Sequence, residues 1–271
     1  MVGHKEAIGV SVIIPVLNEA ENLAELHRRL TAALTALGRT FEVVFVDDGS
    51  GDTTPAILRE LAQKDARVRG VRLDRNYGQH AALMAGMRHA RGAVVVTMDA
   101  DMQTPPEDIP VLLAKLEEGF EVVFGVFERR QHPPLQRLTS AIGHMLVEYA
   151  LRLPRSVHFS PFRALDRQLI NRMTAFTGTP VQLEALMCRC TNRMGAVTVR
   201  HEPRRAGETK YTLRRRLRFA LNLARGIRQT AASRAACANQ RPQYVVAECF
   251  GDFGDAPSGA AAAVLKAAAA R

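Results

Sequence analysis

The chain has 271 residues, of which 47% are hydrophobic, so it is long and apolar enough to bury a full core. Its formal net charge is +10, and most of it lies between residues 200 and 234, where eleven Lys or Arg stand against two Glu, a net charge of +9. No stretch holds the roughly 18 apolar residues that a membrane-spanning helix needs, and the apolar start is too short for a signal peptide.

Short apolar runs rich in β-branched residues alternate with helical patterns along the first half of the chain. The runs cover residues 9–16, 41–50, 68–73, 92–101 and 120–126. The helical patterns lie at residues 21–37, 54–64, 79–90 and 106–118. Strands that alternate with helices predict a parallel sheet with right-handed crossovers, and continuous apolar runs predict strands that are buried on both faces. The pattern therefore predicts an α/β, Rossmann-like fold.

The second half of the chain is predicted to be less regular. Helices are expected at residues 135–153 and 166–175, and a strand-like run at 195–203 leads into the basic segment. From about residue 230 the sequence is low in complexity, and we assign it no regular structure.

Polar clusters follow three of the predicted strands, in the sequences PVLNE, VDDGS and DADMQ. Ligands of open α/β sheets bind outside the carboxyl ends of the strands, so we expect these clusters to line one crevice. Asp99 and Asp101 could direct two carboxylates to one Mg²⁺ or Mn²⁺, which would take its other ligands from water and substrate phosphates. The alternative is that the pair caps the turn before PPED.

The second cluster also places two carboxylates at a strand end. Asp47 and Asp48 could accept hydrogen bonds from a base N–H or from ribose hydroxyls, or they could cap the helix that follows. Taken together, the acidic strand ends predict a site for a nucleotide diphosphate. A metal ion would lie between its negatively charged diphosphate and the carboxylates.

A series of motifs carries a resemblance to a known family. In order along the chain they are VSVIIPVLNEAENL, VFVDDGSGDTT, RNYGQHAALMAGM, MDADMQTPPEDIP, FRALDR and GETKYTLRRRLRFAL. The chain resembles the family 2 glycosyltransferases of GT-A fold over residues 9–228, and within them the polyprenyl-phosphate group that includes dolichol-phosphate mannose synthase and the undecaprenyl-phosphate sugar transferases. The resemblance implies a metal-dependent, inverting transfer of a sugar from a UDP- or GDP-linked donor to a polyprenyl phosphate.

The resemblance also implies roles for individual residues. The implied nucleotide-sugar site consists of Pro15, Leu17, Glu19, Asp47, Asp48, Asp99, Ala100, Asp101 and Gln103. Within it, Asp99, Asp101 and Gln103 would hold the Mg²⁺ or Mn²⁺ ion, and Asp101 is the expected catalytic residue. Arg75, Asn76 and Gly78 match a family turn beside the crevice, with a purely structural turn as the equal alternative.

Cations are expected to bind the acceptor phosphate and the membrane surface. The candidates for the phosphate are Arg129, Arg130, Arg137, Arg163, Lys210 and Arg214. Apolar residues at helical spacing within the basic segment predict an amphipathic helix at about 204–228 that lies on an anionic membrane, the alternative being a solvated basic helix packed on the domain. Nucleic acid is disfavoured as a partner because the segment offers only Tyr211 and Phe219 for stacking.

The chain departs from the family pattern at two places. Ser160 and Pro161 stand where many relatives carry an Asp that is a candidate base, so the reaction either proceeds without a base or uses Asp101 or Asp166. After the basic segment the chain runs directly into RPQYVVAE, where many relatives have two membrane-spanning helices.

These observations predict one catalytic domain over residues 1–228 and a disordered tail over 229–271. The cysteines fit neither a zinc site nor a disulfide scaffold, which predicts reduced thiols in a cytosolic protein. We therefore expect a cytoplasmic protein that attaches peripherally to the inner face of the membrane. A degenerate site that binds nucleotide sugar or lipid phosphate without catalysis is the alternative, and the sugar, the nucleotide and the oligomeric state stay open.

Overall fold

A computed structural model describes residues 7–127, 159–176, 183–202 and 244–252. The strands in these ranges form one sheet in the order β7-β5-β6-β4-β1-β2-β3-β8. Their bounds are β1 Val10–Val16, β2 Phe41–Asp47, β3 Val68–Leu73, β4 Val94–Thr97, β5 Val122–Phe127, β6 Arg163–Asp166, β7 Met194–Val199 and β8 Val246–Phe250. Neighbouring strands pair in parallel except around β6 and at β8, which is antiparallel to β3.

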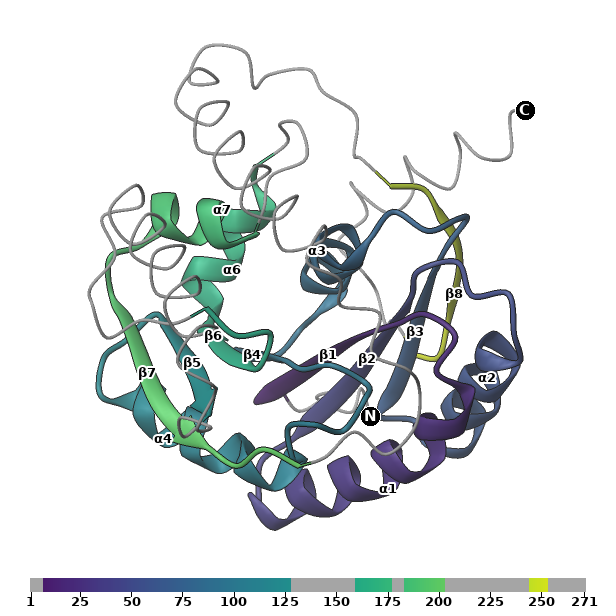
Figure 1. Ribbon diagram of the computed structural model, residues 1–271, viewed down its shortest axis with the longest axis horizontal. Helices are drawn as coiled ribbons and strands as arrows, with labels where there is room; N and C mark the ends of the chain where they lie inside the picture. The colour runs from purple at the N-terminus through teal and green to yellow at the C-terminus, as the bar shows by residue number, and fades with distance from the viewer. Residues whose placement is uncertain (1–6, 128–158, 177–182, 203–243, 253–271) are drawn as a thin grey trace, which may run out of the picture.

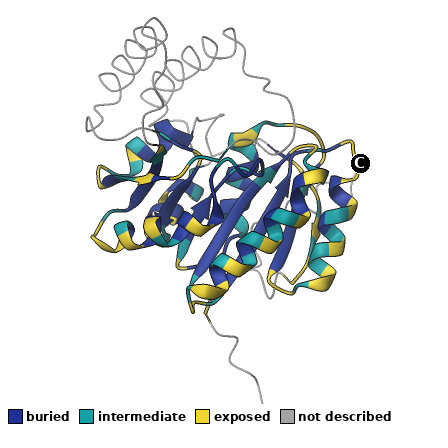
Figure 2. Ribbon diagram, turned by 60° about the horizontal axis from the view of Figure 1, so that its bottom comes forward, coloured by how far each residue is buried: buried dark blue, intermediate teal, exposed yellow. Residues whose placement is uncertain are grey.

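Helices cover both faces of the sheet (Figure 1). Their bounds are α1 Ala20–Ala36, α2 Thr54–Lys64, α3 Gln79–His89, the 3₁₀ helix η1 Pro106–Asp108, α4 Ile109–Glu117, α6 Arg167–Thr174 and α7 Leu183–Cys190. One hydrophobic cluster joins α1, α2 and α4 to the sheet, and a second joins α3, α6 and α7 to its other face. The central strands are therefore buried between two helical layers, as Figure 2 shows.

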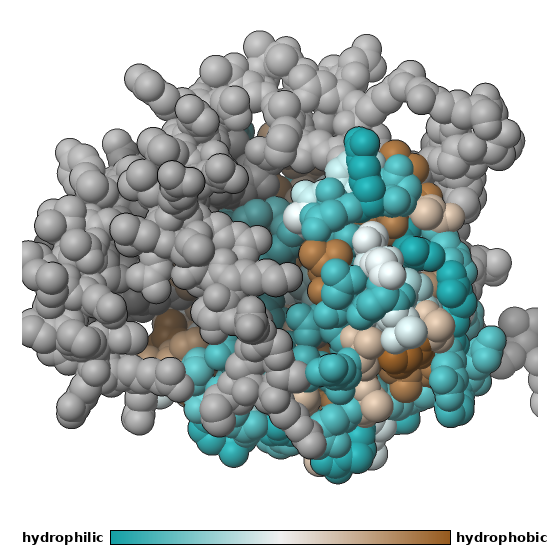
Figure 3. Space-filling model, turned by 45° about the vertical axis from the view of Figure 1, so that its right-hand side comes forward, coloured by the Kyte–Doolittle hydropathy of each residue, from teal (hydrophilic) through white to brown (hydrophobic). Residues whose placement is uncertain are grey.

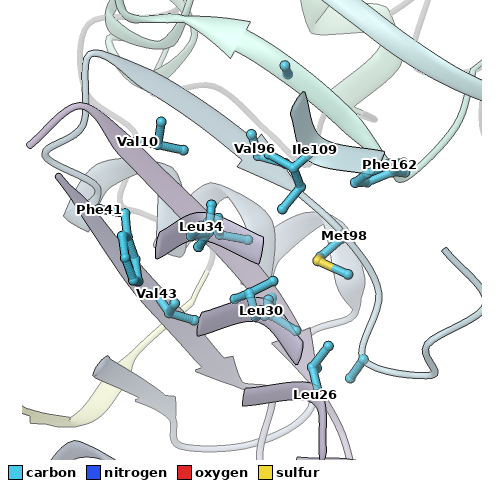
Figure 4. Packing of buried hydrophobic residues seen from close by; sticks show 14 of the residues in the cluster. Val10, Leu26, Leu30, Leu34, Phe41, Val43, Val96, Met98, Ile109 and Phe162 are labelled. Atoms are coloured by element: carbon cyan, nitrogen blue, oxygen red, sulfur yellow. The ribbon is translucent and has the colours of Figure 1, made fainter. Parts of the chain in front are cut away.

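The packing of α1 illustrates why the sequence forms this layer. Its side chains Leu23, Leu26, Leu30 and Leu34 recur every three or four residues and are fully buried. This spacing puts them on one face of the helix, in one hydrophobic cluster with residues of the strands. Figure 4 shows Leu26, Leu30 and Leu34 in that cluster. Burial of each such side chain contributes on the order of 1.5–3 kcal/mol to the hydrophobic driving force.

The predicted strands of the first half are all present, but two of them end earlier than expected. The run at 41–50 ends as a strand at Asp47, because Gly49 has a φ of 74° and turns the chain. The run at 92–101 is a strand only from Val94 to Thr97, and Met102 has a φ of 57° in the loop that follows. Apolar composition predicted these strands, but it did not show where they end. The loops that follow them contain residues with positive φ, Gly49 and Met102.

The prediction of a structureless tail over 229–271 is wrong for Val246–Phe250, which forms β8. The strand depends on tertiary contacts, because it pairs with the sheet edge at β3 and Arg59 of α2 donates to Glu248. Opposite it, Gly70 leaves room for the Phe250 ring, since a Cβ at Gly70 would lie 1.8 Å from that ring. None of these partners is visible in the local pattern of the tail.

Strand β6 and helix α7 were not predicted, while the predicted helix at 166–175 is confirmed as α6. The predicted helices at 135–153 and 204–228 lie outside the described residues, as do Arg129, Arg130, Arg137, Lys210 and Arg214. No helix in the described part of the chain is long and apolar enough to cross a membrane. Figure 3 shows that the described surface on the side of α2 and β8 is mainly hydrophilic, with small separate hydrophobic areas.

Candidate functional site

The structure brings the three polar strand ends together at the carboxyl ends of the central parallel strands, which we call the site edge of the sheet. Strands β1, β2 and β4 are parallel neighbours, with Val16 opposite Asp47 and Ile13 opposite Thr97. The backbone N–H of Asp48 donates to the carbonyl of Val16 at 2.9 Å, which continues the pairing into the loops. The carboxylates that follow β2 and β4 therefore share this edge, where open α/β sheets bind their ligands.

The loop after β1 is fixed to the loop after β2. The backbone N–H of Asn18 donates to Ser50 Oγ at 2.9 Å, and the Asn18 side chain accepts from the N–H of Gly51 at 3.0 Å. Asn18 has a φ of 55°, a conformation that Asn tolerates better than most residues. The neighbouring Leu17 is exposed, and the N–H of Glu19 donates to Thr54 at the start of α2.

Asp47 and Asp48 are buried and accept hydrogen bonds from different loops. Asp47 accepts from the N–H of Ser50 at 2.9 Å and pairs with Arg72 Nε at 3.2 Å. Asp48 accepts from the N–H groups of Tyr77 and Gly78 at 2.7 and 2.8 Å. Burial raises the pKa of Asp48 above its usual value, although the two N–H groups and their hydrogen bonds oppose that rise. Asp48 thus attaches the turn before α3 to the end of β2.

Gly49 makes this junction possible. It has a φ of 74°, and a Cβ at this position would lie 2.5 Å from the carbonyl carbon of Arg75. We expect Gly49→Ala to lower the free energy of unfolding by about 1–3 kcal/mol, because the side chain forces both strain and a backbone shift. Nucleotide affinity is expected to fall with it, since the turn after β2 and the turn before α3 move apart. Denaturant unfolding and calorimetric nucleotide binding measure the two effects.

Gly51 provides the matched control for that substitution. It lies in the same loop, and a Cβ there would meet no atom within 4 Å. Gly51→Ala should leave nucleotide affinity unchanged and stability unchanged or slightly higher. Equal behaviour of the two variants would show that the close approach at Gly49 is unimportant.

The first turn of α3 reaches the carboxylates at the end of β4. Gln79 Nε2 donates to Asp99 Oδ1 at 2.6 Å, so the amide of Gln79 orients the half-buried carboxylate of Asp99. Gly78, with a φ of 91°, is the residue before the helix. Arg75 and Asn76 are exposed, and the Arg75 guanidinium lies 5.0 Å from the centre of the Tyr77 ring. Arg75 and Gly78 of the family turn make contacts within the protein. Gln79, which donates to Asp99, is a residue of the candidate site that the sequence interpretation missed.

Asp101 is buried at the start of the loop that leads to η1. Its Oδ1 accepts a hydrogen bond from the N–H of Gln103 at 3.1 Å. The backbone carbonyl of Gln103 in turn accepts from the N–H of Glu202 at 2.9 Å, so this carbonyl is already engaged within the protein. Of the three residues expected to hold a metal, Gln103 could contribute only its half-buried side chain or a second lone pair.

The donors at this edge fit a hard divalent cation. Asp99 and Asp101 supply carboxylate oxygens, which Mg²⁺ and Mn²⁺ prefer. Among the described residues, no group of three or more His, Cys, Asp or Glu side chains is arranged to hold a metal ion. A cation at Asp99 and Asp101 would therefore take most of its ligands from water and from a bound diphosphate, as Mg²⁺ does at phosphate sites.

Comparison with known proteins decides the family. Residues 11–178, more than half of the chain, match the family model described as Glycosyl transferase family 2. The chain belongs to this family. The undecaprenyl-phosphate 4-deoxy-4-formamido-L-arabinose transferases of Salmonella paratyphi A and Salmonella dublin are each 37% identical to it over 215 residues. The alignment covers 79% of this chain but 66% of each relative, just under two thirds of their length.

Solved structures of the same fold are more distant in sequence. The glucosyl-3-phosphoglycerate synthase of Mycobacterium tuberculosis, crystallised with Mn²⁺, UDP-glucose and phosphoglyceric acid, has a TM-score of 0.59 at 20% identity, covering 83% of this chain and 80% of that one. The mannosyl-3-phosphoglycerate synthase of Rubrobacter xylanophilus has a TM-score of 0.55 at 17% identity, covering 86% and 77%. These similarities confirm the predicted GT-A fold of this family 2 member.

The segment in which this family 2 member departs from the pattern lies beside the site. Thr97, the last residue of β4, donates its hydroxyl to the carbonyl of Pro161 at 2.6 Å. The hydroxyl of Ser160 accepts from the N–H of Phe162 at 3.2 Å. Neither Ser160 nor Pro161 carries a carboxylate, so no side chain at these two positions can act as the base that relatives are expected to place there.

Asp166 does not replace that base. Strand β6 is antiparallel to β4, so Arg163 lies opposite Thr97 at the site edge while Asp166 lies opposite Val94 at the other edge of the sheet. The Asp166 side chain accepts from the N–H of Leu169 at 2.6 Å and caps α6. Its distance from the site along β4 and its capping role exclude it as a base.

Arg163 was expected to bind the acceptor phosphate, but the structure places its side chain in the interior. Its side chain is 1% exposed and its NH1 lies 3.3 Å from Glu184 Oε1 of α7. Burial by itself would raise the pKa of Glu184, but Arg163 and then His80 outweigh it and hold the pKa below its usual value. The guanidinium is thus committed to a buried ion pair, which the sequence could not reveal because α7 was not predicted.

His80 links this ion pair to the first turn of α3. Its Nδ1 lies 3.8 Å from Glu184 Oε2, and the N–H of Leu183 donates to the same nitrogen at 3.4 Å. His80 follows directly after Gln79, which holds Asp99. Glu184 and His80 therefore connect α7 to the residue that follows Gln79, and no local sequence pattern indicated this contact.

Proposed function

We propose that this protein transfers a sugar, with inversion, from a nucleotide diphosphate sugar to a polyprenyl phosphate in a reaction that needs Mg²⁺ or Mn²⁺. The observation that carries the proposal is the placement of Asp99 and Asp101 beside the turn of Asp47 and Asp48 at the ligand-binding edge of the sheet. Family membership and the 37% identity to undecaprenyl-phosphate sugar transferases support the reaction class.

Each group of residues has a distinct role in this proposal. Asp47 and Asp48, with Pro15, Leu17 and Glu19 from the end of β1, bind the nucleoside. Asp99, Ala100, Asp101 and Gln103 border the diphosphate, and a cation held there offsets the charge that develops on the leaving diphosphate. Gln79 and the N–H of Gln103 hold the two carboxylates in position before the donor binds. The carboxylates therefore lose little freedom when the donor enters.

The acceptor explains why a chain with Pro161 could be active. A phosphate monoester is already an anion at neutral pH, so it needs to be positioned rather than deprotonated. Arg129, Arg137, Lys210 and Arg214 are the proposed positioning cations, and Arg163 is left out because it is paired with Glu184. We propose undecaprenyl phosphate as the acceptor, as in the names of the Salmonella relatives, and a peripheral location on the inner face of the membrane through the basic segment 204–228.

The donor is proposed to carry UDP. The M. tuberculosis synthase of similar fold was crystallised with UDP-glucose and Mn²⁺, and the Salmonella relatives are named for transfer of a formamido-arabinose. A modified arabinose linked to UDP is therefore the first sugar donor to test.

A thermal-shift titration tests the site before any turnover is measured. The full chain is titrated with UDP and with GDP, each in Mn²⁺ and in EDTA. We expect the melting temperature to rise with UDP in Mn²⁺ and to rise much less in EDTA, because binding to the native state stabilises it by mass action. No rise with either nucleotide would contradict the proposed donor site.

Transfer to undecaprenyl phosphate is then assayed directly. Product formation would support the enzyme. Metal-dependent UDP binding without any product would favour the alternative, a degenerate binding protein, and the motive for that alternative is Pro161 at the position of the relatives' carboxylate.

A further inference from the structure

Three segments that are far apart in the sequence meet beside the loop of Asp101. They are helix α1, the loop 103–108, and the residues 200–202 that follow β7. Arg29 of α1 lies between two glutamates. Its guanidinium donates to both oxygens of Glu107 at 3.0 and 2.8 Å, and to both oxygens of Glu202 at 2.8 and 3.0 Å. One arginine thus forms two bidentate ion pairs. In a bidentate pair, two N–H groups of the guanidinium bind the two oxygens of one carboxylate, which fixes their relative orientation.

The charges in this group stabilise one another. Arg29 is only 18% exposed, and hydrogen bonds to Glu202 and then Glu107 raise its pKa. The same bonds lower the pKa of Glu107 and of Glu202. All three groups are therefore charged at neutral pH, and the two glutamates would repel each other without Arg29.

A second arginine holds the residue next to Glu107. The backbone N–H of Arg200 donates to Asp108 Oδ2 at 2.7 Å, and its guanidinium donates to Asp108 Oδ1 at 2.8 and 2.6 Å. Asp108 is buried at the end of η1. We call the five residues Arg29, Glu107, Asp108, Arg200 and Glu202 the loop clamp.

The clamp connects through Gln103 to the carboxylate of Asp101 in the candidate metal site. The N–H of Glu202 donates to the carbonyl of Gln103, and the N–H of Gln103 donates to Asp101 Oδ1. Only one residue, Gln103, separates the clamp from Asp101. Between them the loop carries Met102 with a φ of 57°, a conformation that a loop keeps only when its surroundings hold it.

We propose that the loop clamp positions Asp101 for the cation. Its members are positioning residues, because they act through Gln103. This inference rests on the proposed function, since it needs a metal-dependent donor site. Loss of the ion pairs of the clamp should weaken the nucleotide binding that depends on the metal ion. Nucleotide binding without the metal ion should stay unchanged.

The test compares three variants of the full chain. Arg29→Met keeps much of the side-chain volume but removes the charge, so Glu107 and Glu202 are left facing each other. Arg29→Lys keeps the charge but loses the bidentate geometry. Arg39→Met is the matched control, because Arg39 pairs with the exposed Glu117 and touches no member of the clamp.

Calorimetric binding of UDP is measured over a Mn²⁺ titration and again in EDTA. We expect Arg29→Met to need on the order of 10-fold more Mn²⁺ for half-maximal UDP binding, as is typical when support behind a metal ligand is lost. Arg29→Lys should lie between Arg29→Met and wild type, Arg39→Met should match wild type, and UDP affinity in EDTA should be the same in all four proteins.

Two results would overturn the inference. One is wild-type Mn²⁺ dependence in folded Arg29→Met, or in Arg29→Lys if Arg29→Met does not fold. The other is an equal loss of UDP affinity in Mn²⁺ and in EDTA, which would indicate general damage. If wild type itself shows no Mn²⁺-dependent UDP binding, the proposed function fails first and the role of the clamp fails with it.

Discussion

Asp101→Asn is expected to lower kcat for sugar transfer by about 10²–10³-fold while the protein stays folded. Asn has the same size and can still accept the hydrogen bond from the N–H of Gln103, so the loop keeps its turn. What is lost is one negative charge at the site where a cation would stabilise the leaving diphosphate, and removal of one such electrostatic partner typically costs this much. Initial rates at saturating donor and Mn²⁺ measure the effect, and thermal unfolding verifies the fold.

Asp166→Asn is the matched control for that experiment. Asp166 caps α6 at the opposite edge of the sheet, and Asn caps helices about as well as Asp. We expect wild-type kcat in this variant. Full activity of Asp101→Asn would remove the basis of the proposed mechanism, and an inactive Asp166→Asn would show that Asp166 acts in catalysis after all.

Glu42→Ala is expected to lower the free energy of unfolding by about 3–5 kcal/mol. Glu42 is 1% exposed and accepts hydrogen bonds from Ser11 Oγ at 2.6 Å, Arg69 NH1 at 2.7 Å and the N–H of Arg91 at 2.7 Å. Arg69 is also 1% exposed, so the substitution removes the buried carboxylate to which its guanidinium donates. Loss of one partner from a buried ion pair typically costs this amount. Denaturant unfolding at neutral pH measures it.

The stabilising effect of Glu42 should also depend on pH. Burial by itself would raise the pKa of Glu42, but Arg69, the hydroxyl of Ser11 and the N–H of Arg91 outweigh it, so the pKa is lowered in the folded state. A carboxyl whose pKa is lower in the folded than in the unfolded chain contributes its stabilisation above the unfolded pKa of about 4.3 and loses it as the pH falls below that value. Wild type and Glu42→Ala should therefore converge in stability under acid conditions.

Glu60→Ala is the control for that substitution. Glu60 pairs with Lys64 on the exposed face of α2, where ion pairs contribute little. We expect no measurable change in unfolding. A loss in Glu42→Ala no larger than in Glu60→Ala would mean that the buried network does not stabilise the fold.

The predictions for Asp101 and for Glu42 concern opposite ends of the strands of the same sheet. Glu42 and Ser11 lie near the start of β2 and β1, where buried charges join the strands. Asp47 ends β2 and Asp99 follows β4, and hydrogen bonds from Ser50 and Gln79 hold their carboxylates. Substitution of Glu42 should therefore change stability, and substitution of Asp101 should change turnover.

The sequence predicted the central part of the fold because the information there is local. Apolar runs with helical patterns between them require parallel strands, and parallel strands place their carboxyl ends at one edge. The convergence of the ends of β1, β2 and β4 follows from that rule alone. The same local information identified Asp47, Asp48, Asp99 and Asp101 as residues of that edge.

Antiparallel strands and buried charges escaped the sequence for a different reason. The four residues of β6 are too short for a pattern to predict a strand, and β8 forms only because Gly70 and Arg59 receive its side chains. Because β6 runs antiparallel to β4, Arg163 lies opposite Thr97 at the end of β4 near the site, and Asp166 lies opposite Val94 at the other end.

What the sequence by itself determined is the fold class, the family and the edge of the sheet that carries the site, because periodicity and short motifs depend on neighbours along the chain. Only the tertiary structure decided which charged residues are free to meet a ligand. Glu184 binds Arg163, Gln79 holds Asp99, and Glu202 reaches the loop of Asp101. In each case the partner lies at least 20 residues away along the chain, so no pattern of neighbouring residues could predict the contact.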